Sequence, residues 1–149
     1  MRTVIATRYV TPLREGGSLP AIVEADDSVL YVVKFRGAGH GVKALVAECV
    51  TGELARELGL RVPELVRVVI AEELGRNEPD AEIRDLLRAS VGLNLGLDYL
   101  PGSITFDPVA GPAPVAAEAS DIVWLDALTS NVDRTARKPN LLCWHGRLW

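Results

Sequence analysis

The sequence predicts an α+β protein in which a small antiparallel sheet comes first and helical segments follow. β-Branched runs fill much of the first 35 residues, a long segment with helical apolar spacing comes next, and a linker rich in Pro, Ala and Gly follows residue 100. Of the 149 residues, 48% are hydrophobic and 24% are charged. These values are typical of a folded globular protein that is long enough to bury a core.

The first three expected strands are short β-prone runs separated by turn-forming residues. They are RTVIATRYV (2–10), AIVEA (21–25) and VLYVVKF (29–35). The breaks TPLREGGSLP and DDS between these runs are typical of turns, so the three strands are expected to form an antiparallel meander.

The clearest helical pattern follows in VKALVAECVTGELARELGL (42–60). In this segment Ala47, Val50 and Leu54 recur at helical spacing, and Gly59 is a stop signal. A fourth strand around 67–70, a surface helix over 80–90 and a last strand within 91–103 are expected beyond it.

The segment FDPVAGPAPVAAE is the strongest candidate boundary of the chain. Residues 101–115 are therefore expected to link two parts, 1–100 and 116–149. In the second part, a helix is expected from residue 116 to about 131, and LLCWHGRLW is expected to form two short strands joined at His145 and Gly146.

Composition excludes several classes of protein. The net charge is −4 and the basic residues are scattered, which argues against a broad nucleic-acid interface and leaves room for a small anion site. Two cysteines without metal or redox spacing, with only two histidines, do not predict a zinc site. No apolar run approaches the roughly 18 residues of a membrane span, and the early charges do not fit a signal peptide, so a cytoplasmic location is expected.

Lys34 and Glu48 are a candidate ion pair. Lys34 ends the third expected strand, and Glu48 follows fourteen residues later in the expected helix. At about 100° per residue, Glu48 lies beside the apolar stripe and over the small residues Gly52 and Ala55, which leaves room for it to face the sheet. The alternative is that Lys34 ends an edge strand in water and Glu48 is a solvated helix residue.

The segment LREGGSLP joins the first two expected strands. The backbone amides of Gly16 and Gly17 and the hydroxyl of Ser18 could cover phosphate groups. The same glycines could also form a plain turn that needs no ligand.

The segment SNVDRTARKPNLLCW places Asp133 and Asn140 just before an apolar run. Phosphoryl transfer needs a carboxylate that orients or deprotonates the attacking hydroxyl, and a metal ligand a few residues later. Asp133 and Asn140 suit these two roles, and Arg134 could pair with a carboxylate or a phosphate. A polar turn that caps a buried helix would contain similar residues.

Taken together, YVVKF, the helix with Glu48, GLDYLPG and DALTSNVDRTARKPNLLCWHGRLW resemble the HipA-like kinases, in particular their bacterial stand-alone relatives. The resemblance covers nearly the whole chain in the same order. It implies a protein-kinase-like fold with an antiparallel-sheet N-lobe (1–100) that carries one major helix, and the first part of a helical C-lobe (116–149) that carries the catalytic loop.

The resemblance also implies roles for the candidate residues. Lys34 is similar to the strand lysine that contacts the α- and β-phosphates of ATP, Glu48 is similar to its helix partner, and LREGGSLP is similar to the loop over the nucleotide. Backbone groups near Tyr99 and Leu100 would meet adenine. Asp133 resembles the catalytic base, and Asn140 resembles a Mg²⁺ ligand. The implied reaction transfers the γ-phosphate of ATP to a Ser or Thr hydroxyl of an unidentified protein substrate.

The chain departs from the family pattern at two points. The usual spacing from the catalytic Asp to the metal-binding Asn is five positions, which falls on Lys138 here, whereas Asn140 lies seven positions away. Asn140 is preferred because it directly precedes the apolar run and because a lysine cannot replace a magnesium ligand.

The second departure follows Trp149, where similar kinases continue with an Asp-His-Gly segment that supplies a second metal-binding Asp. Without it, the chain is expected to be a truncated kinase or a fragment of one, with weak or no phosphate transfer. The alternatives are a non-catalytic nucleotide-binding or protein-interaction module with a kinase-like N-lobe, and a structural domain in which Lys34, Glu48 and Asp133 never meet.

Overall fold

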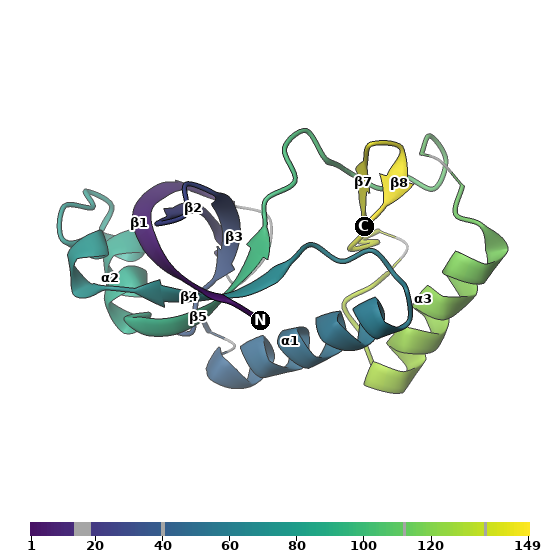
Figure 1. Cartoon of the computed structure of the whole chain (residues 1–149), viewed down its shortest axis with the longest axis horizontal. Helices are drawn as coiled ribbons and strands as arrows, with labels where there is room; N and C mark the ends of the chain where they lie inside the picture. Colours follow the sequence, from purple (N-terminus) through teal and green to yellow (C-terminus); the bar gives the residue numbers. More distant parts are fainter. Residues whose placement is uncertain (14–18, 40, 112, 136) are drawn as a thin grey trace. The chain divides into compact units, whose positions relative to one another are not determined.

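The computed structural model describes residues 1–13, 19–39, 41–111, 113–135 and 137–149, and its fold is α+β (Figure 1). The chain divides into two compact units. The first comprises Met1–Val50 and Glu64–Tyr99, and the second comprises Thr51–Pro63 and Leu100–Trp149. Among the described residues, none of the helices has the length and apolar character needed to cross a bilayer.

The first unit is built on a closed five-stranded barrel. Its strands follow the order β1-β2-β3-β5-β4 around the barrel, and the first three form the predicted antiparallel meander, which is confirmed. The connection from β4 to β5 contains a short 3₁₀ helix, η1, and the predicted surface helix α2. The bounds are β1 Thr3–Pro12, β2 Ala21–Ala25, β3 Leu30–Lys34, α1 Gly41–Glu57, β4 Leu65–Ile70, η1 Glu72–Gly75, α2 Ala81–Ala89 and β5 Gly92–Asp98.

The barrel closes through a parallel pairing that the sequence analysis did not predict. β1 pairs with β4 in parallel, with Val4 opposite Val68, whereas the other strand pairs of the barrel are antiparallel. The expectation of an antiparallel sheet is therefore corrected to a mixed, closed barrel. Parallel strands need a long crossover, and the chain between β1 and β4, which includes α1, provides one.

The inside of the barrel is the main hydrophobic core of the first unit. More and less buried residues alternate at the start of β1 and along β3, as expected when one face of a strand points inward. Gly96 allows β5 to pack closely against β4, because a Cβ at this position would lie 2.6 Å from Val68 Cγ2 and 2.9 Å from Val66 Cγ2. The core residues are Val4, Ala6, Ala21, Val23, Ala25, Tyr31, Val33, Phe35, Val66, Val68, Ile70 and Leu87.

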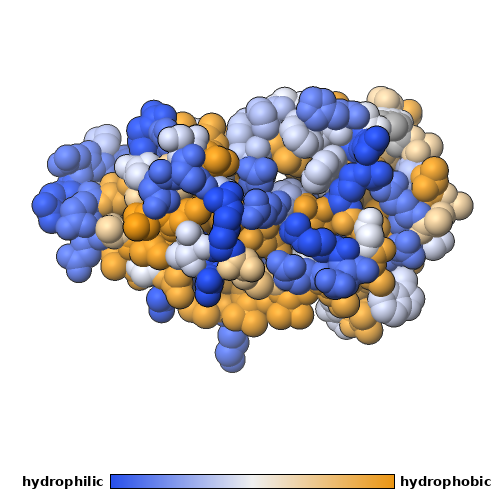
Figure 2. All heavy atoms as spheres, viewed as in Figure 1, coloured by the Kyte–Doolittle hydropathy of each residue, from blue (hydrophilic) through white to orange (hydrophobic). Residues whose placement is uncertain are grey.

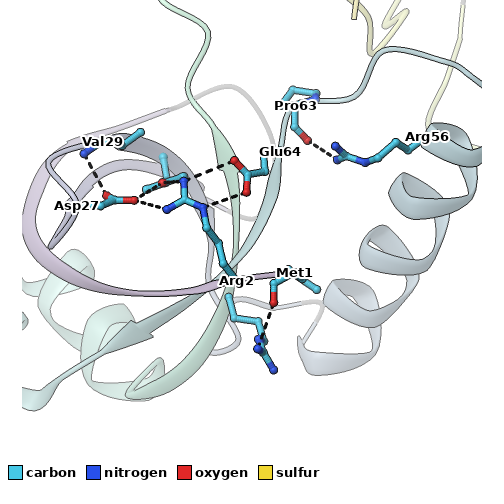
Figure 3. A network of polar contacts seen from close by, with 9 residues as sticks. Met1, Arg2, Asp27, Val29, Arg56, Pro63 and Glu64 are labelled. Atoms are coloured by element: carbon cyan, nitrogen blue, oxygen red, sulfur yellow. Dashed lines mark hydrogen bonds and ion pairs between the residues drawn. The ribbon is translucent and has the colours of Figure 1, made fainter.

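A polar network ties the start of β1 to two other segments of the barrel (Figure 3). Arg2 Nη1 lies 2.5 Å from Asp27 Oδ2 in the turn after β2, and Arg2 Nε donates to Glu64 Oε1 at 3.0 Å just before β4. The Tyr31 hydroxyl accepts from Arg2 Nη2 at 2.6 Å and donates to Asp27 Oδ2 at 2.7 Å. Burial alone would raise the pKa of Asp27, but the hydrogen bonds from Arg2 and Tyr31 outweigh burial and lower it.

The second unit contains helix α3 (Ala116–Thr129) and a three-stranded antiparallel sheet in the order β6-β7-β8. The predicted helix from residue 116 is confirmed; it ends at Thr129, and its C-cap Ser130 is left-handed with φ 52°. The predicted pair of strands at the C-terminus is also confirmed, and His145 and Gly146 between them both have positive φ, as a tight hairpin turn requires. The strands are β6 Ile104–Thr105, β7 Leu142–Trp144 and β8 Arg147–Leu148.

Gly96→Ala should destabilise the first unit. Its added methyl would meet branched side chains of β4 inside the barrel, and overpacking of this kind costs about 1–3 kcal/mol. Gly39→Ala is the matched control, because a Cβ there would meet no described atom within 4 Å. Denaturant unfolding should show a lower midpoint for Gly96→Ala alone. Equal midpoints for the two variants would contradict the close approach of β4 and β5.

Candidate functional site

Lys34 and Glu48 form an ion pair in the first unit. Lys34 Nζ lies 2.6 Å from Glu48 Oε2, and the two side chains are 31% and 40% exposed. β3 lies between β2 and β5 in the barrel, so the alternative in which Lys34 ends an edge strand is wrong. The predicted contact is present, and the role of the two residues in catalysis stays a prediction.

The local structure explains why these two side chains meet. Along β3, Tyr31 and Val33 point into the barrel, so Lys34 points away from its core. Glu48 lies in the second turn of α1, which begins at Gly41. A pair that is one-third exposed contributes little to stability, about 0–1 kcal/mol. The contact orients the ammonium group, which remains partly exposed.

Some backbone groups that follow β5 are already hydrogen-bonded within the protein. The Tyr99 amide donates to the Leu30 carbonyl at 3.0 Å, and the Leu100 carbonyl accepts from the Ser103 amide at 3.1 Å. Burial, followed by the nearby Glu64, raises the pKa of Asp98, which directly precedes Tyr99. The expectation that Tyr99 and Leu100 contact adenine stays a prediction.

In the second unit, the loop after α3 brings Asp133 and Asn140 together. Asn140 Nδ2 donates to the backbone carbonyl of Asp133 at 3.0 Å, and the Asp133 amide donates to Asn131 Oδ1 at 3.1 Å. Both Asp133 and Asn140 are exposed. The contact uses the amide nitrogen of Asn140, so Oδ1, the atom that can bind Mg²⁺, is not the atom used.

Lys138, the other candidate for the metal-ligand position, lies in a turn. Its amide donates to the Thr135 carbonyl at 3.1 Å, and its carbonyl accepts from the Thr135 amide at 2.9 Å. Asn140 has a left-handed backbone with φ 47°, a conformation that Asn tolerates better than most residues. The structure therefore places Asn140 against Asp133 and places Lys138 in the turn with Thr135.

Arg134 holds this loop in place. Its Nε donates to Asp126 Oδ2 at 2.6 Å, and its Nη1 donates to the carbonyls of Pro139 at 2.6 Å and Asn140 at 3.1 Å. Asp126 Oδ1 accepts from Asn131 Nδ2 at 2.8 Å. Of the two partners predicted for Arg134, a carboxylate or a phosphate, the structure contains the carboxylate.

Sequence reasoning missed Asp126, although one signal pointed to it. Asp126 lies in the last turn of α3, where a negative charge is unfavourable beside the carbonyl end of a helix. An acid in such a position indicates a specific cationic partner, and Arg134 follows eight residues later.

The structure gives limited information on the predicted phosphate-binding and metal-binding residues. Gly16, Gly17 and Ser18 lie outside the described residues, so their contact with phosphates stays a prediction. In the part of the chain that the structure describes, no three His, Cys, Asp or Glu side chains come together to hold a metal ion. Magnesium is commonly held by one or two carboxylates together with substrate phosphates, so the role of Asn140 as a ligand stays a prediction.

The comparisons with known proteins identify the family of the chain. The first unit offers a lysine paired with a glutamate, and the second offers an Asp and an Asn in one loop, a set typical of kinase-related proteins. The family described as HipA-like kinase matches residues 6–147, so the chain belongs to the HipA-like kinase family. Neither the curated proteins nor the solved structures gave a significant match.

Arg134→Ala should loosen the loop that contains Asp133 and Asn140. Removal of the guanidinium leaves Asp126 without its cationic partner, and the loss of hydrogen bonds to a charged group costs about 1–3 kcal/mol. Amide hydrogen exchange should accelerate in residues 131–140, and the unfolding midpoint should fall. Arg137→Ala, a change of an exposed arginine in the same loop, is the control and should leave both unchanged. The same exchange pattern in the two variants would show that Arg134 does not hold the loop.

Proposed function

We propose that this chain belongs to a protein kinase that uses ATP and Mg²⁺ to phosphorylate a Ser or Thr hydroxyl, and that it carries both nucleotide-binding and catalytic-loop residues. The observation that carries the proposal is the 2.6 Å contact between Lys34 and Glu48 in a chain of the HipA-like kinase family. A lysine on a sheet, held by a glutamate on the following helix, is the arrangement with which protein kinases contact ATP phosphates.

In this proposal residues 1–100 are the N-lobe of a protein-kinase-like fold, and residues 101–115 link it to residues 116–149, which carry the catalytic loop. Lys34 contacts the α- and β-phosphates, and Glu48 keeps its ammonium in position. Gly16, Gly17 and Ser18 cover the nucleotide, and Tyr99 and Leu100 border adenine. Because the reaction consumes ATP, the proposed location is the cytoplasm.

Residues 116–149 supply the groups that act on the transferred phosphate. Asp133 orients the attacking hydroxyl and accepts its proton, while Oδ1 of Asn140 is a ligand for Mg²⁺. The bound ion supplies positive charge that stabilises the transferring phosphoryl group. Arg134 supports both residues, because its hydrogen bonds fix the loop to Asp126.

ATP with Mg²⁺ should protect the chain against thermal unfolding. A ligand that binds only the folded state stabilises it by about 2.7 kcal/mol at one hundred times its Kd. Lys34→Ala should reduce this protection at every ATP concentration. Lys43→Ala, which removes an exposed lysine from α1, is the control with the same change of charge. Equal protection of wild type and Lys34→Ala would show that Lys34 is not at the nucleotide.

Any phosphate transfer that the wild type shows should be lost in Asp133→Ala, and ATP protection should remain, because the carboxylate acts on the hydroxyl and not on nucleotide binding. Transfer from labelled ATP to Ser- and Thr-containing polypeptides measures the first property, and thermal unfolding measures the second. Transfer that survives Asp133→Ala would refute the role of Asp133. ATP protection without any transfer in wild type would favour the alternative of a non-catalytic nucleotide-binding module.

A further inference from the structure

Two polar side chains outside the candidate site are fully buried in the first unit. Ser90 is 0% exposed and Asn94 is 4% exposed, and they are the buried polar side chains among the described residues. Ser90 follows α2, and Asn94 belongs to β5. Burial of polar groups is unfavourable unless they are hydrogen-bonded, so their partners indicate what they hold in place.

Both side chains bind the backbone that directly follows Lys34. Asn94 Oδ1 accepts from the Arg36 amide at 2.8 Å, and Ser90 Oγ accepts from the Gly37 amide at 3.2 Å. Asn94 Nδ2 donates to the carbonyls of Ser90 at 2.8 Å and Gly92 at 2.9 Å. Because both hydrogens and the oxygen of the Asn94 amide are used, its orientation is fixed.

The backbone at Gly37 also packs closely against the end of α2. A Cβ on Gly37 would lie 2.6 Å from Ala89 Cβ and 2.8 Å from Ser90 Oγ. The hydrogen bonds and this close approach together fix the segment from Arg36 to Gly37. We call this segment, together with Ser90 and Asn94, the β3–α1 clamp.

The clamp matters because the first half of α1 has little packing of its own. None of the residues Gly41–Val50, all of which the structure describes, is buried, and Val42, Val46 and Val50 are 50%, 56% and 61% exposed. Figure 2 shows hydrophobic atoms at the lower surface of the view, where Figure 1 draws the first turns of α1. Core packing therefore does not set the position of Glu48 on this helix.

Two backbone hydrogen bonds of described residues lie between the clamp and the start of α1. The Ala38 amide donates to the Phe35 carbonyl at 3.1 Å, and the Gly41 amide donates to the Ala38 carbonyl at 2.9 Å, where α1 begins. The position of Glu48 relative to Lys34 thus depends on a segment whose backbone Asn94 and Ser90 hold.

We propose that Asn94 and Ser90 are positioning residues that hold the β3–α1 loop and thereby set the Lys34–Glu48 ion pair for nucleotide binding. The proposal rests on the proposed function of that pair. Neither residue contacts the nucleotide in this proposal, and both act through the backbone of Arg36 and Gly37.

The first experiment needs no nucleotide. In Asn94→Ala, the rate at which an amine-acylating reagent labels Lys34, relative to exposed Lys43 in the same molecule, should rise about fivefold, because loss of a hydrogen bond to the loop frees the ammonium from Glu48. Ser90→Ala removes only the acceptor for Gly37 and should give a smaller rise. Val4→Ala, a cavity in the barrel core, should lower stability and leave the ratio unchanged.

The second experiment measures ATP affinity at a temperature where all variants are folded. Asn94→Ala should weaken binding about fivefold to tenfold, and Val4→Ala should not. In a Lys34→Ala background, Asn94→Ala should cause no further loss, because residues that act through one another are not additive.

The outcomes separate the two proposals. If the wild type does not bind ATP, the proposed function fails. The labelling ratio then tests by itself whether Asn94 and Ser90 position the Lys34–Glu48 pair. An unchanged ratio in folded Asn94→Ala and Ser90→Ala would overturn the positioning role, and so would an equal rise in Val4→Ala. Should Asn94→Ala not fold, Ser90→Ala provides the same test.

Discussion

Closure of the barrel by the pairing of β1 with β4 is the constraint on which the first unit depends. It removes the free edges that an open five-stranded sheet would have, and it brings side chains of β1, β2, β3 and β4 into one core, which β5 approaches at Gly96. Once the interior is filled by apolar side chains, the charged end of β3 has to lie outside it. The outward direction of Lys34 is therefore a consequence of how the barrel is filled, and Glu48 of α1 meets Lys34 outside the barrel.

Local elements of the fold could be predicted because they depend on neighbouring residues. β-Branched runs gave the meander, helical spacing gave α1, and the segment LLCWHGRLW gave the terminal hairpin, with bounds close to those observed. The parallel pairing of β1 with β4 could not be predicted, since it joins strands about 60 residues apart whose composition does not specify a partner. The two-residue strand β6 was also missed, because a segment of that length has no periodicity.

The candidate site likewise contains some contacts that could be predicted from the sequence and some that could not. Lys34 and Glu48 could be paired from the sequence because a strand end and a helix face determine where long charged side chains point. Ser90 and Asn94 were not predicted, and the reason is physical. Their partners are backbone amides of Arg36 and Gly37, which every residue except proline has. Because almost any residue can supply such a backbone amide, the type of the partner residue gives no sequence signal for these contacts.

The backbone of Asn140 limits which residues can occupy its position. Its positive φ falls in a region that Gly, Asn and Asp adopt most readily. Gly would satisfy the backbone and bring no side-chain oxygen, whereas Asp would bring a charge and lose the amide hydrogens that bind the Asp133 carbonyl. Asparagine thus meets the conformational and hydrogen-bonding requirements together, and its free Oδ1 suits the proposed role as a Mg²⁺ ligand, so substitutions here are expected to be unfavourable for reasons of shape as well as chemistry.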